Sequence, residues 1–396
     1  MKILTKKKML RECGLVLVGA VCGVAWGWHG AGALIGLSVL VPLAWAHAQN
    51  RLFAAAVMFA YYLGVSRGLP EGTGIFFAQS APVWFGWALW AGVAALNASV
   101  WGVLWSHSPR RVAIGIPAAI LITALPPIGL IGWANPLTAA GTLFPGLGFI
   151  GIALLLAVWV AVVLGRRAIV LGLTAACLLS NAIAPSMVVR APSWIGMDTH
   201  YGRLGSGSTD FMAAFSRIQS VQDLAERLRP GQVAVLPETI MGRFTEATES
   251  LLADTNRLLA AKGSAIIAGA ELFGESGTGR LNNALVVLDG QGTKPMIQRV
   301  PVPIGMWRPW DSMTFDAYPF GRGISKVAGK RVAYAVCYEQ LLVYPLLVSL
   351  AHSPDVMIGA ANDWWARTTS IPEIQGQALD AWGRLFNVPV IRATNI

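Results

Sequence analysis

The chain has 396 residues, of which 55% are hydrophobic, and a formal net charge of +10. That charge lies in residues 1–189, which hold eleven Lys or Arg against the two acids Glu12 and Glu71, while the remainder holds nineteen bases and eighteen acids. Because these bases stand between long apolar runs, they argue against a soluble nucleic-acid-binding domain. They predict membrane phospholipid as the partner and no direct binding of nucleic acid.

Seven apolar runs in the first half predict transmembrane helices, since each is near the roughly 17 to 25 residues that a bilayer core requires. A signal peptide is the alternative for the first run, which three lysines precede, but six further runs favour a polytopic protein. The runs lie at residues 13–29, 30–47, 52–66, 82–105, 112–133, 146–164 and 168–188.

The positions of the bases predict the orientation of these helices. With a cytoplasmic N-terminus, ten of the eleven Lys and Arg of the first half fall on the cytoplasmic side, and Arg67 alone lies outside. Seven crossings then place the second half in the periplasm of a Gram-negative cell. We therefore predict a multi-pass protein of the bacterial inner membrane, with a transmembrane helical domain over residues 1–189 and a periplasmic domain over residues 190–396.

The second half is long enough for one globular domain with its own core. Its predicted strands and helices alternate, which favours an α/β layered sandwich. The strands are expected at 233–236, 264–270, 283–288, 332–336, 356–360 and 388–394, and the helices at 247–262, 341–351 and 371–386.

Cys337 is the only cysteine of residues 190–396 and lies at a predicted strand-to-helix junction. A helix N-terminus stabilises a thiolate and lowers the pKa of the thiol, so this position suits a nucleophile. A lone thiol in an oxidising compartment has no disulfide partner and needs another explanation. An inert buried core thiol is the alternative.

A thiol nucleophile needs a base, and Glu238 is the candidate because it directly follows a predicted buried strand. Desolvation raises the pKa of such a carboxyl and makes it a usable proton acceptor. A surface acid beside Pro237 is the alternative. No metal or other cofactor is expected, since His200 and His352 lie far apart with no neighbouring ligand pattern.

Five short motifs follow one another in the second half. They are Leu-Pro-Glu-Thr at 236–239, Val-Pro-Ile-Gly at 302–305, Val-Cys-Tyr-Glu at 336–339, Ala-Asn-Asp-Trp-Trp at 361–365 and Ile-Arg-Ala-Thr-Asn at 391–395. Their order resembles that of apolipoprotein N-acyltransferases, which are polytopic membrane enzymes with a periplasmic domain of the nitrilase superfamily. Within that superfamily the stretch 301–310 resembles most the conjugal-transfer TraB proteins.

This resemblance implies a nitrilase-like (carbon-nitrogen hydrolase) αββα sandwich, a Glu-Lys-Cys triad and an acyl-thioester intermediate. Matched position by position, it makes Cys337 the nucleophile, Glu238 the general base and Glu339 a supporting carboxylate.

The same matching assigns residues to substrate binding. The backbone N–H of Tyr338 would donate to an oxyanion, and Asn362 and Trp365 would line the acyl pocket. Trp307 belongs to an aromatic stretch that predicts a lid reaching into the lipid headgroups, for which an ordinary packed loop is the alternative.

Three departures from the family pattern weaken the resemblance. Gln298 stands where the family has its lysine; the neighbouring cation Arg299 replaces that lysine only if the strand slips by one residue, because adjacent residues point to opposite faces. Met306 stands where acyltransferases carry a glutamate. The family also continues past the position of Asn395 with strands and a final transmembrane helix, which predicts an exposed sheet edge or a partner covering it.

Two functions remain open. In the first, the protein is a Cys-dependent acyltransferase or amidohydrolase that takes an acyl group from phospholipid and passes it to a lipoprotein, another amine or water; a true apolipoprotein N-acyltransferase is one form of this. In the second, it is a catalytically weakened accessory or assembly factor of a conjugative DNA-transfer apparatus. Glu238 and Cys337 favour the first, whereas Gln298 and Met306 favour the second.

Overall fold

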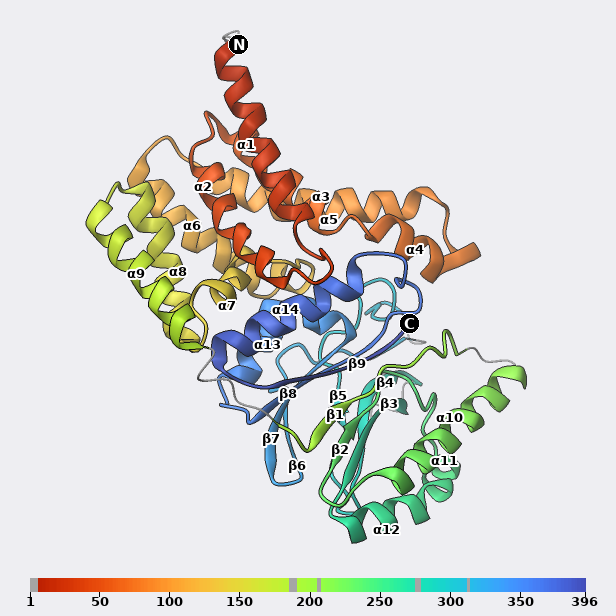
Figure 1. The fold of residues 1–396 in the computed structure, drawn as a ribbon. Helices are drawn as coiled ribbons and strands as arrows, with labels where there is room; N and C mark the ends of the chain where they lie inside the picture. Colours follow the sequence, from red (N-terminus) through yellow and green to blue (C-terminus); the bar gives the residue numbers. More distant parts are fainter. Residues whose placement is uncertain (1–5, 185–190, 205–207, 275–278, 312–313) are drawn as a thin grey trace. The chain divides into compact units, whose positions relative to one another are not determined.

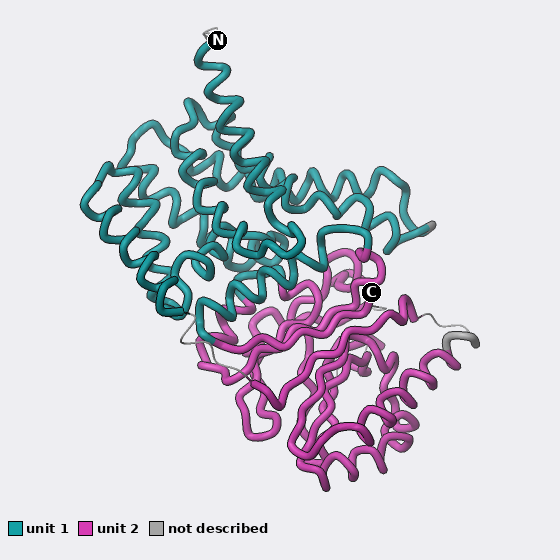
Figure 2. The backbone as a smooth tube through the Cα atoms, in the orientation of Figure 1, with its two compact units in different colours: residues 1–188, 341–344, 368–387 teal, residues 189–340, 345–367, 388–396 magenta. Residues whose placement is uncertain are grey.

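The computed structural model describes residues 6–184, 191–204, 208–274, 279–311 and 314–396. The chain divides into two compact units (Figure 2). Unit 1 comprises residues 1–188, 341–344 and 368–387, and unit 2 comprises residues 189–340, 345–367 and 388–396. The predicted boundary near residue 190 lies outside the described residues. Residues 368–387, which we expected in the second domain, group with unit 1.

Unit 1 is helical, and each of the seven predicted apolar runs contains at least one helical segment. Two further short helices, α4 and α7, lie between the runs. The helices are α1 (Lys6–Val24), α2 (Leu40–Ala46), α3 (Arg51–Val65), α4 (Leu69–Phe77), α5 (Trp84–Leu104), α6 (Pro109–Ala124), α7 (Ala140–Leu143), α8 (Gly148–Val163), α9 (Arg167–Ile183) and α14 (Ile371–Phe386), with 3₁₀ segments at Gly32–Val39, Ala78–Ser80, Ile128–Leu130 and Pro136–Ala139.

Length and composition qualify one helix of the described residues, α5, as a membrane span. The number rises to three if each of two bent pairs forms one span. These pairs are α3 with α4, bent by 50°, and Pro136–Leu143 with α8, bent by 114°. The helices thus occur where the apolar runs predict them, but most are shorter than a bilayer core requires. Seven crossings stay a prediction.

Glycines allow close helix packing within unit 1. A Cβ added at Gly19 or Gly23 of α1 would lie 2.3 Å from the carbonyl oxygen of Val57 or 2.2 Å from that of Tyr61, both in α3. Small residues let helix backbones approach closely where apolar driving forces are weak. α14 joins the same unit through Gln377, which donates to the carbonyl of Trp28 at 2.8 Å.

Unit 2 contains two β-sheets (Figure 1). In the first, with strand order β1-β2-β3-β4-β5, the first three strands are parallel and the last two pair antiparallel. In the second, β6 pairs antiparallel with β7, and β7, β8 and β9 are parallel. The strands are β1 (Trp194–Gly196), β2 (Val233–Val235), β3 (Ala265–Phe273), β4 (Leu281–Leu288), β5 (Met296–Ile297), β6 (Ile324–Val327), β7 (Lys330–Val336), β8 (Val356–Asn362) and β9 (Val390–Asn395).

Alternation along the strands gives each face of the first sheet its own core. Val235, Ile267 and Leu285 pack in one buried cluster with Val336 and Ile358 of the second sheet. Intervening residues of the same strands pack against helices α10 (Ser208–Arg227) and α12 (Ala253–Lys262), and the short helix α11 (Glu246–Leu251) precedes α12. Unit 2 therefore has the helix, sheet and sheet layers of the predicted αββα sandwich, while α14, a helix expected in the same domain, groups with unit 1.

Several elements differ from the sequence-based expectation. The predicted helix over 247–262 is two helices, α11 and α12, and the helix expected from residue 341 begins later, as α13 (Val343–Leu350). A 3₁₀ segment, Cys337–Leu341, precedes it. Helix α10 and the short strands β1, β5 and β6 were not predicted, because two- to four-residue strands carry too little alternation to recognise.

Candidate active site

Cys337 lies at the turn that ends β7. Its backbone adopts the left-handed conformation, with φ of 50°, and its side chain is 4% exposed. Burial raises the pKa of the thiol well above its ordinary value, and the charges of Glu238 and Asp363 raise it further, while the backbone N–H of Asn362 opposes them. The expectation of a lowered thiol pKa is therefore wrong, because burial and two carboxyls outweigh the helix terminus.

Glu238 follows β2 by three residues and is 3% exposed. Burial raises the pKa of its carboxyl to about 7, although hydrogen bonds from Cys337, from the Asn283 side chain and from the Asn362 backbone lower it. The backbone N–H of Asn362 donates to Oε2 at 2.9 Å, and Asn283 Nδ2 donates to Oε1. A carboxyl that titrates near neutrality is suited to accept a proton from a thiol.

Gly269 of β3 permits this placement of Glu238. A Cβ at residue 269 would lie 2.4 Å from the Cα of Glu238 and 2.3 Å from the backbone nitrogen of Thr239. The chain after β2 thus crosses directly over a strand position that has no side chain. Any larger residue at 269 would displace the base.

Gln298 lies beside the nucleophile and is fully buried. Its Nε2 donates to the carbonyl of Val336 at 2.9 Å, and its Oε1 accepts from Asn283 Nδ2 at 2.7 Å. The position that the family resemblance assigns to lysine therefore faces the site but holds a neutral amide.

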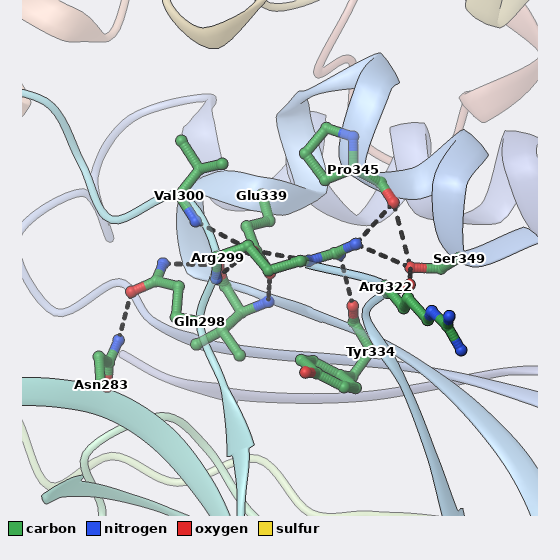
Figure 3. Close-up of polar contacts among 10 residues, drawn as sticks. Asn283, Gln298, Arg299, Val300, Arg322, Tyr334, Glu339, Pro345 and Ser349 are labelled. Carbon is green, nitrogen blue, oxygen red and sulfur yellow. Dashed lines mark hydrogen bonds and ion pairs between the residues drawn. The ribbon is translucent and has the colours of Figure 1, made fainter. Parts of the chain in front are cut away.

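Arg299, which we considered as a substitute for that lysine, points the other way (Figure 3). Its guanidinium donates to Glu339 at 3.2 Å, and the rest of the guanidinium donates to partners in other elements. These partners are the carbonyl of Pro345 at 2.8 Å, the hydroxyl of Ser349 at 2.9 Å and the carbonyl of Tyr334 at 3.0 Å. A Cβ at Gly323 would lie 2.1 Å from the guanidinium, so a glycine leaves room for it. The catalytic assignment of Arg299 is corrected: it is a buried structural residue.

The Glu339 carboxylate links the turn of Cys337 to the segment after β5 through hydrogen bonds from the backbone. Its Oε2 accepts from the backbone N–H of Val336 at 3.0 Å. Its Oε1 accepts from the backbone N–H groups of Arg299 at 2.6 Å and Val300 at 3.0 Å. The expected supporting carboxylate thus acts on the backbone around the thiol.

Asn362, at the end of β8, is tied to the site from several sides. Besides its backbone bond to Glu238, its side chain donates to Thr239 Oγ1 and accepts from Asn395 Nδ2 at 2.7 Å. It orders the base, and its predicted contact with an acyl group stays a prediction.

The remaining predicted substrate residues lie on two loops. Trp365 is partly buried and follows the buried Asp363 by two residues. Trp307 belongs to a tight loop, in which its backbone N–H donates to the carbonyl of Val302 at 3.0 Å. Trp310, further along that loop, is 76% exposed. The substrate-binding roles of Tyr338, Trp365 and Trp307 stay predictions.

Asn283 is the site residue that sequence reasoning missed. Its side chain is 1% exposed and contacts both Glu238 and Gln298. The signal was available, because two asparagines begin an otherwise apolar strand, and buried amides require partners. Among the described residues, no group of three His, Cys, Asp or Glu side chains is arranged to hold a metal ion.

A buried thiol at the end of β7 and a buried carboxyl after β2 lie on two sheets that share one core, which defines an α/β protein with a paired thiol and carboxyl. The chain is 35% identical to the conjugal transfer protein TraB of Agrobacterium fabrum, over 96% of this chain and 92% of that protein. It therefore belongs to the TraB family of conjugal transfer proteins.

Two more distant similarities cover parts of the chain. The apolipoprotein N-acyltransferase of Pseudomonas syringae pv. tomato is 29% identical over 44% of this chain and 37% of its own length. Among solved structures, the carbon-nitrogen hydrolase of Helicobacter pylori G27 aligns with 51% of this chain and 72% of its own, at 14% identity and a TM-score of 0.37. No protein-family model matches the chain.

Proposed function

We propose that the protein is a Cys-dependent acyltransferase or amidohydrolase that acts at the periplasmic face of the bacterial inner membrane through an acyl-thioester on Cys337. The observation that supports this most is the hydrogen bond between Cys337 and a buried Glu238 whose pKa is about 7. Such a carboxyl is partly ionised at neutral pH and is therefore ready to accept the thiol proton.

In the proposed reaction, Cys337 Sγ attacks the carbonyl carbon of the acyl donor while Glu238 accepts the thiol proton. The tetrahedral oxyanion collapses, the leaving group takes the proton from Glu238, and the thioester remains. An amine or water then attacks the thioester and loses a proton to Glu238, and the returning proton restores the thiol.

The oxyanion has neutral donors in this proposal. The backbone N–H of Tyr338 is one, as expected of the residue after a nucleophile. The second N–H of Gln298 Nε2 is another, because the first is bound to Val336. Neutral donors stabilise an oxyanion less than an ammonium does, which predicts slow turnover.

Phospholipid is the proposed acyl donor, and a lipoprotein or another amine is the proposed acceptor. The helical unit 1, with the membrane-span candidate α5 among its described residues, supports action at a bilayer. The basic loops support a cytoplasmic N-terminus, several crossings and a periplasmic unit 2. Reporter fusions placed after residue 190 should behave as periplasmic, and a cytoplasmic signal would reject this orientation.

A second candidate is an accessory factor of a conjugative transfer apparatus with weakened catalysis. It is favoured by one observation: burial raises the pKa of the Cys337 thiol, while Arg299, the cation next to Gln298 in sequence, is bound to Glu339. A thiol without a facing cation is a poor nucleophile at neutral pH.

Intact mass spectrometry separates the two candidates. The purified full chain is incubated with phospholipid vesicles, and wild type is compared with Cys337→Ser. A hydroxylamine-sensitive acyl adduct on wild type alone is expected for the enzyme. Absence of the adduct, where an apolipoprotein N-acyltransferase run in parallel is loaded, would favour the accessory function.

A further inference from the structure

Two neutral amides link the base to the residue that precedes the nucleophile, beside the direct hydrogen bond between Glu238 and Cys337. Asn283 Nδ2 donates to Glu238 Oε1 and also to Gln298 Oε1, the latter at 2.7 Å. Gln298 Nε2 in turn donates to the carbonyl of Val336, the residue before Cys337. All four residues belong to unit 2.

A backbone hydrogen bond also joins Asn283 and Gln298, the two residues that carry these amides. The N–H of Gln298 donates to the carbonyl of Asn283 at 2.7 Å, immediately after the antiparallel pairing of β4 with β5. Asn283 is 1% exposed and Gln298 is fully buried, so water does not compete for these bonds. The Asn283 side-chain amide is therefore held in one geometry, in which it donates to both Glu238 and Gln298.

We propose that Asn283 is a positioning residue, which holds the Glu238 carboxylate toward Cys337 and, together with Gln298, replaces the charged member of a triad by a pair of neutral amides. This deepens the proposed function by explaining how the base is oriented without a cation. Asn283 acts through Glu238 and does not touch the substrate.

The charged surroundings of Glu238 leave this role to an amide. Glu271 of β3 raises the pKa of Glu238 and is itself 4.0 Å from Arg243. The Cys337 side chain and the Asn362 backbone donate hydrogen bonds. Asp363 adds negative charge near the thiol. The Asn283 side chain is thus the side-chain amide that donates to the second carboxylate oxygen, Oε1, while the Asn362 backbone donates to Oε2.

The test is an infrared titration of the full chain in detergent. The C=O stretch of protonated Glu238 is isolated by subtracting spectra of Glu238→Gln, and its midpoint is read against pH. In wild type the midpoint is expected at about 7. Asn283→Leu keeps the branching of the side chain but removes the donor, so the midpoint should rise by about 1 pH unit, the equivalent of one charge-assisted hydrogen bond.

A matched control lies one residue away. Asn282 is also buried, on the same strand, but faces away from Glu238 because strand side chains alternate. Asn282→Leu should leave the midpoint at its wild-type value. Asn283→Ser, a smaller change that cannot bridge both partners, should raise the midpoint less than Asn283→Leu does, and it serves if the leucine variant fails to fold.

An unchanged or lowered midpoint in the variant that folds would overturn the proposal. An equal rise in Asn282→Leu would overturn it as well, because the effect would then come from general loosening of β4. The titration needs no acyl donor, so its result is independent of whether an acyl adduct forms. Failure of this inference and failure of the proposed function are therefore distinguished.

Discussion

Gln298 and Arg299 are neighbours in sequence, but their buried side chains point to opposite sides of the segment that follows β5. On one face, Gln298, Asn283 and Glu238 form a neutral or titrating network beside the thiol. On the other, Arg299 and Glu339 form a buried ion pair at 3.2 Å, with side chains 2% and 0% exposed. The comparison teaches that a cation one position away cannot replace a missing lysine. The first network handles a proton, and the second holds the backbone that presents the thiol.

The largest expected effect comes from breaking the ion pair. Glu339→Gln or Arg299→Met should destabilise unit 2 by about 3 to 5 kcal/mol, since each leaves one buried charge without a partner. Thermal unfolding of the detergent-solubilised chain measures this. The exposed pair Arg331 and Asp355, 3.9 Å apart, is the control. Arg331→Met should lower the stability of unit 2 by less than about 1 kcal/mol. An equal loss of stability in the buried-pair and exposed-pair variants would show that the effect does not depend on burial of the ion pair.

Replacing the base should act on reaction and leave the structure intact. Glu238→Gln removes the proton acceptor, so acyl loading of Cys337 should fall about 10²- to 10⁴-fold. Loading is followed by intact mass spectrometry over time, with unfolding temperature as the control for folding. Loading at the wild-type rate would assign the proton to another group.

Restoring a cation on the thiol side should sharpen the contrast between the faces. In Gln298→Lys an ammonium would favour the thiolate, and alkylation of Cys337 at pH 7 should rise about tenfold for each unit by which the thiol pKa falls. Gln298→Met has a similar length and no charge, and it should show no such rise. An equal rise in the alkylation rate in both variants would show that the reagent reaches Cys337 more easily, and would contradict an effect of the lysine charge.

The smallest effect is the pH dependence of the wild-type protein. Burial raises the pKa of Glu238 to about 7, so the carboxyl is protonated, and useless as a base, below that pH. The loading rate should therefore rise as pH increases through about 7, where half of the Glu238 carboxyl is ionised, and level off above that pH as ionisation becomes complete. In Arg299→Lys, where the changed side chain pairs with Glu339 and not with Glu238, the pH at which the loading rate is half of its maximum should stay the same. A rate that falls as pH rises through 7 would contradict the assignment of the base.

Much of the site could be predicted from the sequence because it lies at the ends of apolar runs. Cys337 directly follows β7 and Glu238 follows β2 by three residues, so local pattern placed both near strand ends, whereas Asn362, the last residue of β8, was assigned only through the family resemblance. Asn283 could not be placed this way. Its partners Glu238 and Gln298 lie 45 and 15 residues away, and only the pairing of β4 with β3 and β5 brings them together.

The division into a basic apolar half and a mixed-charge half and the candidate thiol and carboxyl could be predicted from the sequence, and the family resemblance added the neutral residue in place of lysine. The division and the two candidates follow from composition and from hydrophobic runs, which act locally along the chain. The tertiary structure alone decided that Gln298 faces the thiol while Arg299 binds Glu339, and that α14 groups with the helices of unit 1. It also decided that the pKa of Cys337 is raised, because burial and the charges around a thiol depend on segments that are distant in sequence.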